Sequence, residues 1–161
     1  MVVLGRGLKF LFLCARVGRM KKYKILLESG LCPAPYKHEL DAAGIMVEYF
    51  ESDLLFLRRK LNVSPDLLVK KSNQVWELKS PKGNGKRTIA NNLREASHQS
   101  KKVILDLSRC KLNNKNALAR VRSFLKSGDS TLEELLVIDK GGKVLEFHCK
   151  KMYNKNRLKS V

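Results

Sequence analysis

Two acidic residues and one lysine lie close together in the sequence, with a spacing that suits phosphodiester hydrolysis. Asp66 follows a proline, and Glu77 and Lys79 lie further along with a single residue between them. Carboxylates can hold a divalent cation, Mg²⁺ or Mn²⁺, which lowers the pKa of a bound water and polarises a phosphoryl oxygen. A lysine beside that cation stabilises negative charge on the attacking water or the phosphate. We therefore expect Asp66 and Glu77 to bind a metal and Lys79 to assist catalysis.

These residues belong to a predicted β-hairpin over residues 64–81. Apolar and polar residues alternate on both sides of Ser72-Asn73, which has the composition of a tight turn. Because successive side chains of a strand point to opposite faces, the hydrophobic pattern also predicts the register. The opposed apolar pairs of that register are Val69 with Trp76 and Leu67 with Leu78.

The polar face of this hairpin brings the candidate catalytic residues together. In the predicted register Asp66 lies opposite Lys79 and diagonal to Glu77, at separations of roughly 5 and 7–8 Å. A divalent cation with its bound waters would bridge that span. An ordinary cross-strand ladder of salt bridges would have the same composition, so the pattern alone leaves both interpretations open.

The rest of the chain predicts a mixed fold. Apolar residues at steps of three and four predict helices over 35–50, 88–102 and 116–126. Short apolar runs predict further strands over 53–58, 103–107, 132–138 and 143–147. Strands flanked by helices indicate an α/β protein, specifically an α+β sandwich. We expect one domain over 26–149, preceded by an arm (1–25) and followed by a basic tail (150–161).

The charge balance indicates a polyanionic partner. The 161 residues include 33 Lys and Arg against 15 Asp and Glu, a formal net charge of +18. Such an excess opposes compaction, and nucleic acid is the partner that it favours, with a membrane surface as the alternative. The apolar run 8–15 is far shorter than the roughly 20 residues of a membrane span, so no stable membrane insertion is expected. Residues 1–19 would also fit an upstream extension of the reading frame, because Met20 could serve as a start, or a poor secretion signal.

The four cysteines give no metal or disulfide motif. Cys14, Cys32, Cys110 and Cys149 show no C-x-x-C spacing, and the three histidines do not cluster with them. We therefore expect free thiols in a reducing compartment, which agrees with a cytoplasmic site of action.

The motif resembles that of a nuclease superfamily. Pro65-Asp66, followed after ten residues by Glu77-Leu78-Lys79, resembles the PD-(D/E)XK signature. A closer similarity, over residues 26–110, is to the CdiA C-terminal nuclease domain of contact-dependent growth inhibition toxins. It is carried by segments 33–39, 64–66, 75–81, 92–100 and 103–109. The resemblance implies a restriction-endonuclease-like core, with a central mixed β-sheet flanked by helices, and a metal-dependent tRNA nuclease.

The resemblance also implies roles for individual residues. Asp66 and Glu77 match the metal-binding acids, Lys79 the catalytic lysine, and Glu39 an acid on the first helix that completes such sites. Glu39 equally fits a first-turn acid favoured by the helix dipole, and Glu48 is a weaker substitute. Positions that match substrate contacts are Lys82, Lys86, Arg87, Thr88 and Gln99. A solvated basic loop and an exposed structural glutamine are the alternatives for these, and His38 is expected to be structural rather than to assist catalysis.

We therefore expect an endonuclease that acts on RNA in preference to DNA, and the resemblance implies that the RNA is tRNA. The alternatives are a nucleic-acid-binding module without catalysis, a DNA-cleaving nuclease and, more weakly, a basic membrane-surface protein. The resemblance further implies a toxin system with delivery or secretion and an acidic immunity protein as partner. From the sequence we expect neither a delivery module nor a clear export signal, so a detached toxin cassette and a nuclease serving its own cell are both open.

Overall fold

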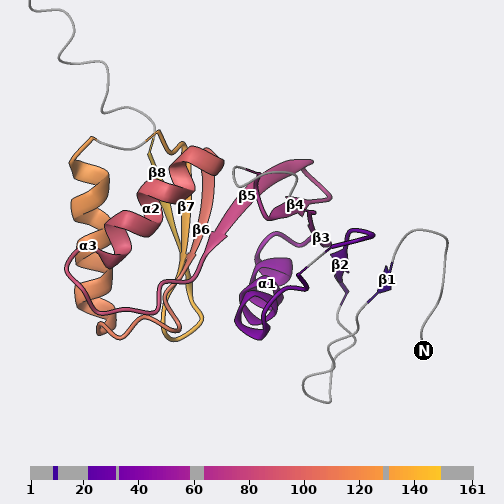
Figure 1. Cartoon of the computed structure of the whole chain (residues 1–161), viewed down its shortest axis with the longest axis horizontal. Helices are drawn as coiled ribbons and strands as arrows, with labels where there is room; N and C mark the ends of the chain where they lie inside the picture. The colour runs from indigo at the N-terminus through magenta and orange to yellow at the C-terminus, as the bar shows by residue number, and fades with distance from the viewer. Residues whose placement is uncertain (1–8, 11–21, 32, 59–63, 129–130, 150–161) are drawn as a thin grey trace, which may run out of the picture. The chain divides into compact units, whose positions relative to one another are not determined.

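The computed structural model describes residues 9–10, 22–31, 33–58, 64–128 and 131–149, which belong to two compact units (Figure 1). The N-terminal unit is residues 1–76 and the C-terminal unit is residues 77–161. Both contain helix and strand, and together they have the mixed sheet pairing of the α+β class that the sequence predicts. The predicted tail over 150–161 and most of the predicted arm lie outside the described residues.

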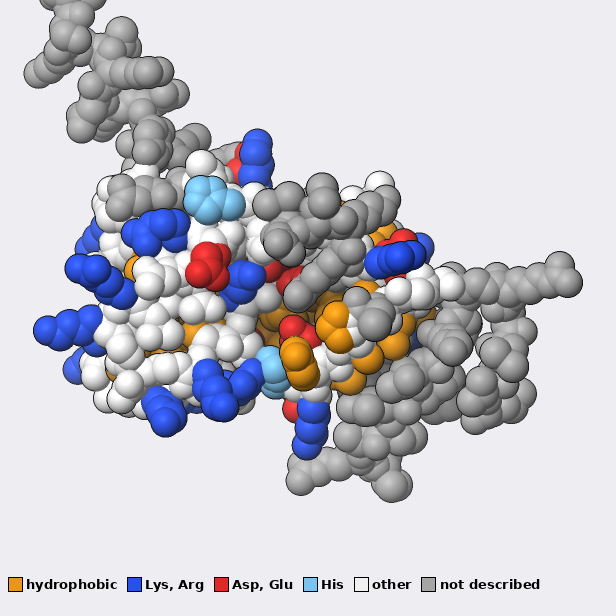
Figure 2. All heavy atoms as spheres, viewed as in Figure 1, with side chains coloured by type: hydrophobic (Ala, Val, Ile, Leu, Met, Phe, Trp, Pro, Cys, Tyr) orange, Lys and Arg blue, Asp and Glu red, His pale blue; other side chains and the backbone are white. Residues whose placement is uncertain are grey.

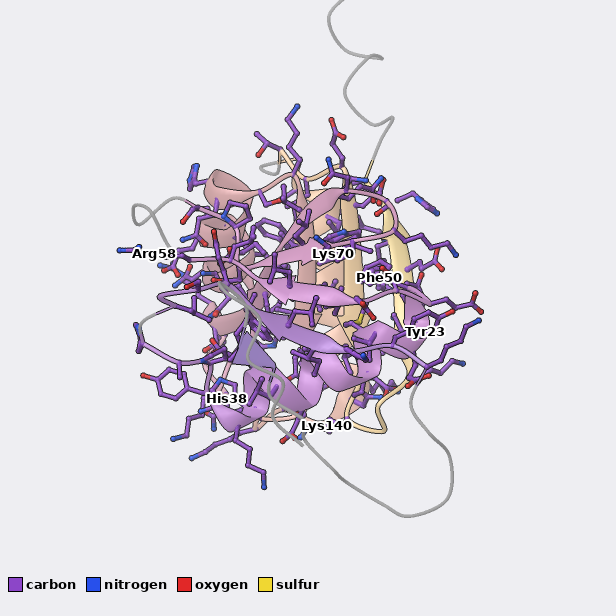
Figure 3. All side chains as sticks on the ribbon, turned by 90° about the vertical axis from the view of Figure 1, so that its right-hand side faces the viewer. Tyr23, His38, Phe50, Arg58, Lys70 and Lys140 are labelled. Carbon is purple, nitrogen blue, oxygen red and sulfur yellow. The ribbon has the colours of Figure 1, made fainter. Side chains whose placement is uncertain are left out.

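The N-terminal unit consists of strands and one helix. Its elements are β1 (Lys9–Phe10), β2 (Ile25–Leu27), α1 (Lys37–Tyr49), β3 (Leu54–Phe56), β4 (Leu67–Val69) and the first half of β5 (Gln74–Lys79). The strands are in sequence order, and among the described residues of this unit β2 and β3 form the one parallel pair. Helix α1 buries the stripe Ala42, Ala43, Met46 and Val47, as its apolar spacing predicts. Phe50, which is labelled in Figure 3, follows α1. Its ring packs on the Trp76 ring, with centroids 5.3 Å apart.

The hairpin forms, but its register differs from the predicted one by two residues. Leu67 pairs with Trp76 and Val69 pairs with Gln74, whereas the sequence pattern predicts Leu78 and Trp76 as their partners. The reason lies in the turn, which comprises four residues (70–73), and Asn73 adopts a left-handed φ of 53°. A shift of two residues keeps every side chain on its face, so the hydrophobic pattern cannot tell the two registers apart.

The C-terminal unit packs two helices on a sheet. It contains the second half of β5, α2 (Thr88–Gln99), β6 (Lys102–Asp106), α3 (Asn114–Lys126), β7 (Glu134–Ile138) and β8 (Val144–His148). β6 runs parallel to β5 and β7, and β8 is antiparallel to β7. The core between sheet and helices is formed by Ile89, Leu93 and Ala96 of α2, Val103 and Leu105 of β6, Val121 and Phe124 of α3, and Leu135 and Val137 of β7.

Most of the predicted elements are present in the described part of the chain. All three predicted helices are found, with α1 and α2 shorter than expected by two or three residues at an end, and α3 beginning two residues early. Strand β2 was not predicted, because only three residues pair in it and Leu26 alone is buried. Such a run is too short for an alternating pattern to emerge. No helix among the described residues has both the length and the apolar character needed to cross a membrane.

The left-handed turn residue gives a test of the observed register. We expect Asn73→Ala to lower the free energy of unfolding by about 1 kcal/mol, because a Cβ-bearing residue other than Asn or Asp is disfavoured at positive φ. Asn73→Gly should leave stability almost unchanged. Urea denaturation of these variants beside Ser72→Ala, a neighbouring exposed turn residue, provides the measurement. Equal stability of the Ala and Gly variants at position 73 would contradict the four-residue turn.

Candidate active site

The ammonium group of Lys79 lies between a carboxylate and an amide in the C-terminal unit. Its Nζ atom is 2.7 Å from Oε1 of Glu77 and donates a hydrogen bond of 2.8 Å to Oε1 of Gln99. The Glu77 side chain is 2% exposed and that of Lys79 is 20% exposed. The structure therefore brings together three residues that the sequence assigned to one site, in a setting that is nearly closed to solvent.

Strand alternation and the end of a helix produce this arrangement. Glu77 and Lys79 are two residues apart in β5, so their side chains share a face, while Leu78 points to the other. Gln99 is the last residue of α2, the helix that connects β5 to the parallel strand β6. Because β6 begins at Lys102, directly after α2, the chain returns to the sheet with Gln99 against Lys79. The contact thus follows from the β5–α2–β6 connection.

The buried charge at Glu77 requires a partner. Transfer of a carboxylate out of water costs several kcal/mol unless an opposite charge and hydrogen bonds compensate. Lys79 supplies the opposite charge, and Gln99 accepts a second bond from the same ammonium group. The ion pair therefore fixes Lys79 in one position, and it does so at the part of the strand where hydrolytic chemistry was predicted.

The two acids predicted in the N-terminal unit have different surroundings. Asp66 is 7% exposed and directly precedes β4. Glu39 lies in the first turn of α1, where its Oε2 atom accepts a hydrogen bond of 2.8 Å from the backbone N–H of Tyr36. The first-turn role that the sequence left open for Glu39 is thus present. Glu48 is exposed, and His38 stacks on Tyr36 with ring centroids 5.6 Å apart.

The predicted substrate cations lie on a loop between β5 and α2. Lys82, Lys86 and Arg87 are exposed, and Thr88 begins α2. Figure 2 shows such Lys and Arg side chains spread over the visible face of the molecule. Two glycines allow the loop to pass close to Thr88, because a Cβ built at Gly83 or at Gly85 would lie 3.0 Å from the Thr88 Oγ1 atom.

A buried carboxylate that the sequence analysis did not single out lies at the end of β6. Asp106 is 2% exposed. Its Oδ1 atom accepts a 2.9 Å hydrogen bond from the backbone N–H of Ser108, and its Oδ2 atom accepts bonds from the hydroxyls of Ser80 (2.9 Å) and Ser108 (2.8 Å). The signal in the sequence is an acid inside the apolar run 103–107, a run that predicts a strand whether or not the acid has a role of its own.

The donor set suits a hard cation that needs few protein ligands. Among the described residues, no group of three or more His, Cys, Asp and Glu side chains is placed to hold a metal ion. Mg²⁺ commonly keeps several waters and uses only one or two protein carboxylates together with substrate phosphate. Carboxylate oxygens are the ligands that such an ion prefers, so each of the buried acids Asp66 and Glu77, taken by itself, suits Mg²⁺ or Mn²⁺ better than a soft metal.

Comparison with known proteins identifies similar domains. Residues 63–144 match the family model described as the contact-dependent growth inhibition CdiA C-terminal domain. The fold is similar to a chain of the CdiA-CT/CdiI toxin and immunity complex from Burkholderia pseudomallei, with a TM-score of 0.51 and 17% sequence identity over 76% of this chain and 98% of that chain. At that identity the likeness concerns the fold alone. A search of curated proteins found no matching sequence.

A double-mutant cycle tests the energetic weight of the buried pair. We expect Lys79→Met to destabilise the protein by about 3 kcal/mol, because it leaves the Glu77 carboxylate buried without its ammonium partner. Glu77→Gln in the same background should recover much of this loss, with a coupling energy of about 2 kcal/mol. The measurement is urea denaturation of the four proteins at pH 7.

The control cycle uses an exposed pair of the same unit. Lys101 and Glu133 are 3.5 Å apart, and their side chains are 71% and 31% exposed. Lys101→Met and Glu133→Gln should therefore couple by less than about 1 kcal/mol. Equal coupling energies in the two cycles would show that burial adds nothing to the Glu77–Lys79 pair.

Proposed function

The chain belongs to the family of contact-dependent growth inhibition CdiA C-terminal toxin domains, and from this membership we propose that it is a metal-dependent endonuclease that hydrolyses RNA, with tRNA as its substrate. The observation that carries the proposal is the buried Glu77 carboxylate paired with Lys79, whose ammonium group also bonds Gln99. We also propose that the fold has a PD-(D/E)XK core, since Glu77 and Lys79 share one face of a strand beside the parallel strand β6.

We propose that Asp66 and Glu77 bind one divalent cation. Asp66 immediately precedes Leu67, and Glu77 immediately follows Trp76, the residue with which Leu67 pairs. Both side chains are buried, and they match the two metal-binding acids that the family resemblance implies. When bound, Mg²⁺ or Mn²⁺ would supply a water of lowered pKa and neutralise the phosphate. Glu39 is proposed as a third acid, through the oxygen that does not accept the Tyr36 hydrogen bond.

The proposed role of Lys79 depends on how its ammonium group is held. An ammonium group has three hydrogens to donate. In Lys79 one of them is directed to Glu77 and a second to Gln99. The third is available to a phosphate oxygen or to the attacking water. Because the positive charge is already fixed in place, it stabilises the developing negative charge with little reorganisation. Gln99 is thus proposed to orient the lysine rather than to contact the substrate itself.

The net charge supports the choice of a polyanionic substrate. A formal charge of +18 and the exposed Lys82, Lys86 and Arg87 near the proposed site favour a sugar-phosphate chain. RNA is chosen over DNA from the family resemblance. The same positive charge suits an acidic immunity protein that would cover the toxin, and the similar solved structure is a toxin and immunity complex. We therefore propose that a partner of this kind binds and inhibits the chain.

Nuclease assays with acid variants test the proposal. Purified protein is incubated with labelled tRNA, single-stranded RNA and duplex DNA in Mg²⁺, Mn²⁺ or EDTA. We expect metal-dependent cleavage of RNA, and a loss of at least about 100-fold for Asp66→Asn, Glu77→Gln and Lys79→Met, because each removes charge from the reacting centre. Asp41→Asn, which removes an exposed acid of α1, should retain activity.

Three other results would change the assignment. Cleavage that survives Asp66→Asn or Glu77→Gln would rule out these residues as the site. Cleavage of DNA in place of RNA would retain the chemistry and change the substrate. Salt-dependent binding without cleavage under any metal condition would instead indicate a nucleic-acid-binding module. Mn²⁺ titration calorimetry on the Asp66→Asn protein separates a loss of metal binding from a loss of catalysis.

A further inference from the structure

The loop between β5 and α2 is attached to the C-terminal unit along its whole length. We define the basic loop as residues 80–87. At its start, the Ser80 hydroxyl donates to the buried Asp106 carboxylate at 2.9 Å. At its middle, the Gly83 carbonyl accepts from the Lys111 backbone N–H at 3.4 Å and from the Cys110 thiol at 3.5 Å.

The end of the basic loop has a third attachment. Nη1 of Arg120, on α3, donates to the carbonyl oxygens of Lys86 at 2.5 Å and Gly85 at 3.4 Å. Backbone carbonyls of the loop thus accept hydrogen bonds from α3 and from the segment between β6 and α3, while the Ser80 hydroxyl donates to Asp106 of β6. The side chains of Lys82, Lys86 and Arg87 are exposed. The loop therefore has an inner, hydrogen-bonded side and an outer, cationic side.

Such attachments are more than a solvated basic loop requires. Like charges on a short loop repel one another, and a solvated loop would separate them by moving. Here the carboxylate of Asp106, which is 2% exposed, accepts a hydrogen bond from the first residue of the loop. A buried charge therefore holds the start of the loop in place. Cations on a loop fixed in this way bind phosphate with a smaller loss of conformational entropy. The geometry therefore favours a preformed phosphate-binding element.

We propose that Asp106 is a positioning residue for the basic loop, holding it through Ser80 so that its cations meet the phosphates of the substrate. This inference rests on the proposed function for the identity of the substrate as RNA. Asp106 does not touch the substrate in this account. It acts through Ser80, which directly follows Lys79 in the chain, and so it also fixes the end of the strand that carries Glu77 and Lys79.

A second serine on the same carboxylate provides a matched control. Ser108 donates its hydroxyl to the same Oδ2 atom at 2.8 Å, against 2.9 Å for Ser80. It lies directly beyond β6 and outside the basic loop, and its backbone N–H keeps a bond to Oδ1. Ser80→Ala and Ser108→Ala therefore remove the same group from the same partner without a change of charge, and only the first releases the loop.

The experiment measures how RNA binding depends on salt. Binding of a fluorescein-labelled RNA to the full chain is followed by anisotropy between 50 and 200 mM KCl in EDTA, so that no cleavage occurs. Each phosphate contact contributes about 0.7 to the slope of log K against log salt for a single strand. We expect Ser80→Ala to reduce the slope by at least one such contact and Ser108→Ala to leave it unchanged. A general loss of folded protein lowers the apparent affinity without lowering the slope.

Two further variants keep the test decisive if Ser80→Ala folds poorly. Asp106→Asn should reduce the slope as Ser80→Ala does, although it raises the net charge, which by itself would act in the opposite direction. Arg120→Gln should also reduce the slope, because it releases the other end of the loop. Its control is Arg122→Gln, which removes an equal charge at an exposed position of the same helix. Circular dichroism checks that each variant is folded.

The inference is overturned if Ser80→Ala and Asp106→Asn keep the wild-type slope, or if Ser108→Ala loses as much as Ser80→Ala. The salt slope is independent of catalysis, so the two proposals fail separately. A chain that never cleaves RNA but shows the predicted slopes retains the positioning role of Asp106 and loses the nuclease assignment. A chain that cleaves RNA with unchanged slopes retains the nuclease assignment alone.

Discussion

The carboxylate of Glu77 is buried beside the ammonium group of Lys79, and a charge left alone there would cost several kcal/mol. This requirement constrains the surrounding structure. Lys79 has to lie two residues along the same strand, and α2 has to end at Gln99, where its amide oxygen accepts a bond from the same ammonium group. A pair held in this way stabilises one arrangement of side chains. It also places a fixed positive charge beside a negative one, and the proposed phosphate chemistry depends on this combination.

The spacing of residues was sufficient to predict which side chains share a face. Glu77 and Lys79 were expected together because strands alternate, and the structure confirms their contact at 2.7 Å. The strand and helix types were also predictable, since the apolar periods of α1, α2 and β6 are clear. The hairpin register was not predictable. The two candidate registers differ by an even number of residues, so both place the same side chains on the same face. The conformation of Asn73 decides between them, and no hydrophobic pattern reports the φ angle of a single turn residue.

Contacts between distant segments could not be predicted from the sequence. Asp106 and Ser80 meet because β5 and β6 are parallel neighbours and both end at the same edge, a consequence of topology that local patterns do not contain. Arg120 meets the basic loop from a helix more than thirty residues away. Glu39 was difficult to assign for a different reason. A glutamate in the first turn of a helix can have a structural role there or be a catalytic acid. The hydrogen bond to Tyr36 shows the first of these roles, and the second stays a proposal.

Strand β5 is shared by the two units, which restricts how the sequence can change in length. Residues 74–76 pair with β4 and residues 77–79 pair with β6. Deletion or insertion of one residue between Trp76 and Glu77 would reverse the side-chain orientation on one side of the change. Either the aromatic packing around Trp76 or the Glu77–Lys79 pair would then be lost. Single substitutions in this strand preserve the alternation of side chains, whereas the insertion or deletion of one residue does not, so changes of length should be found outside β5.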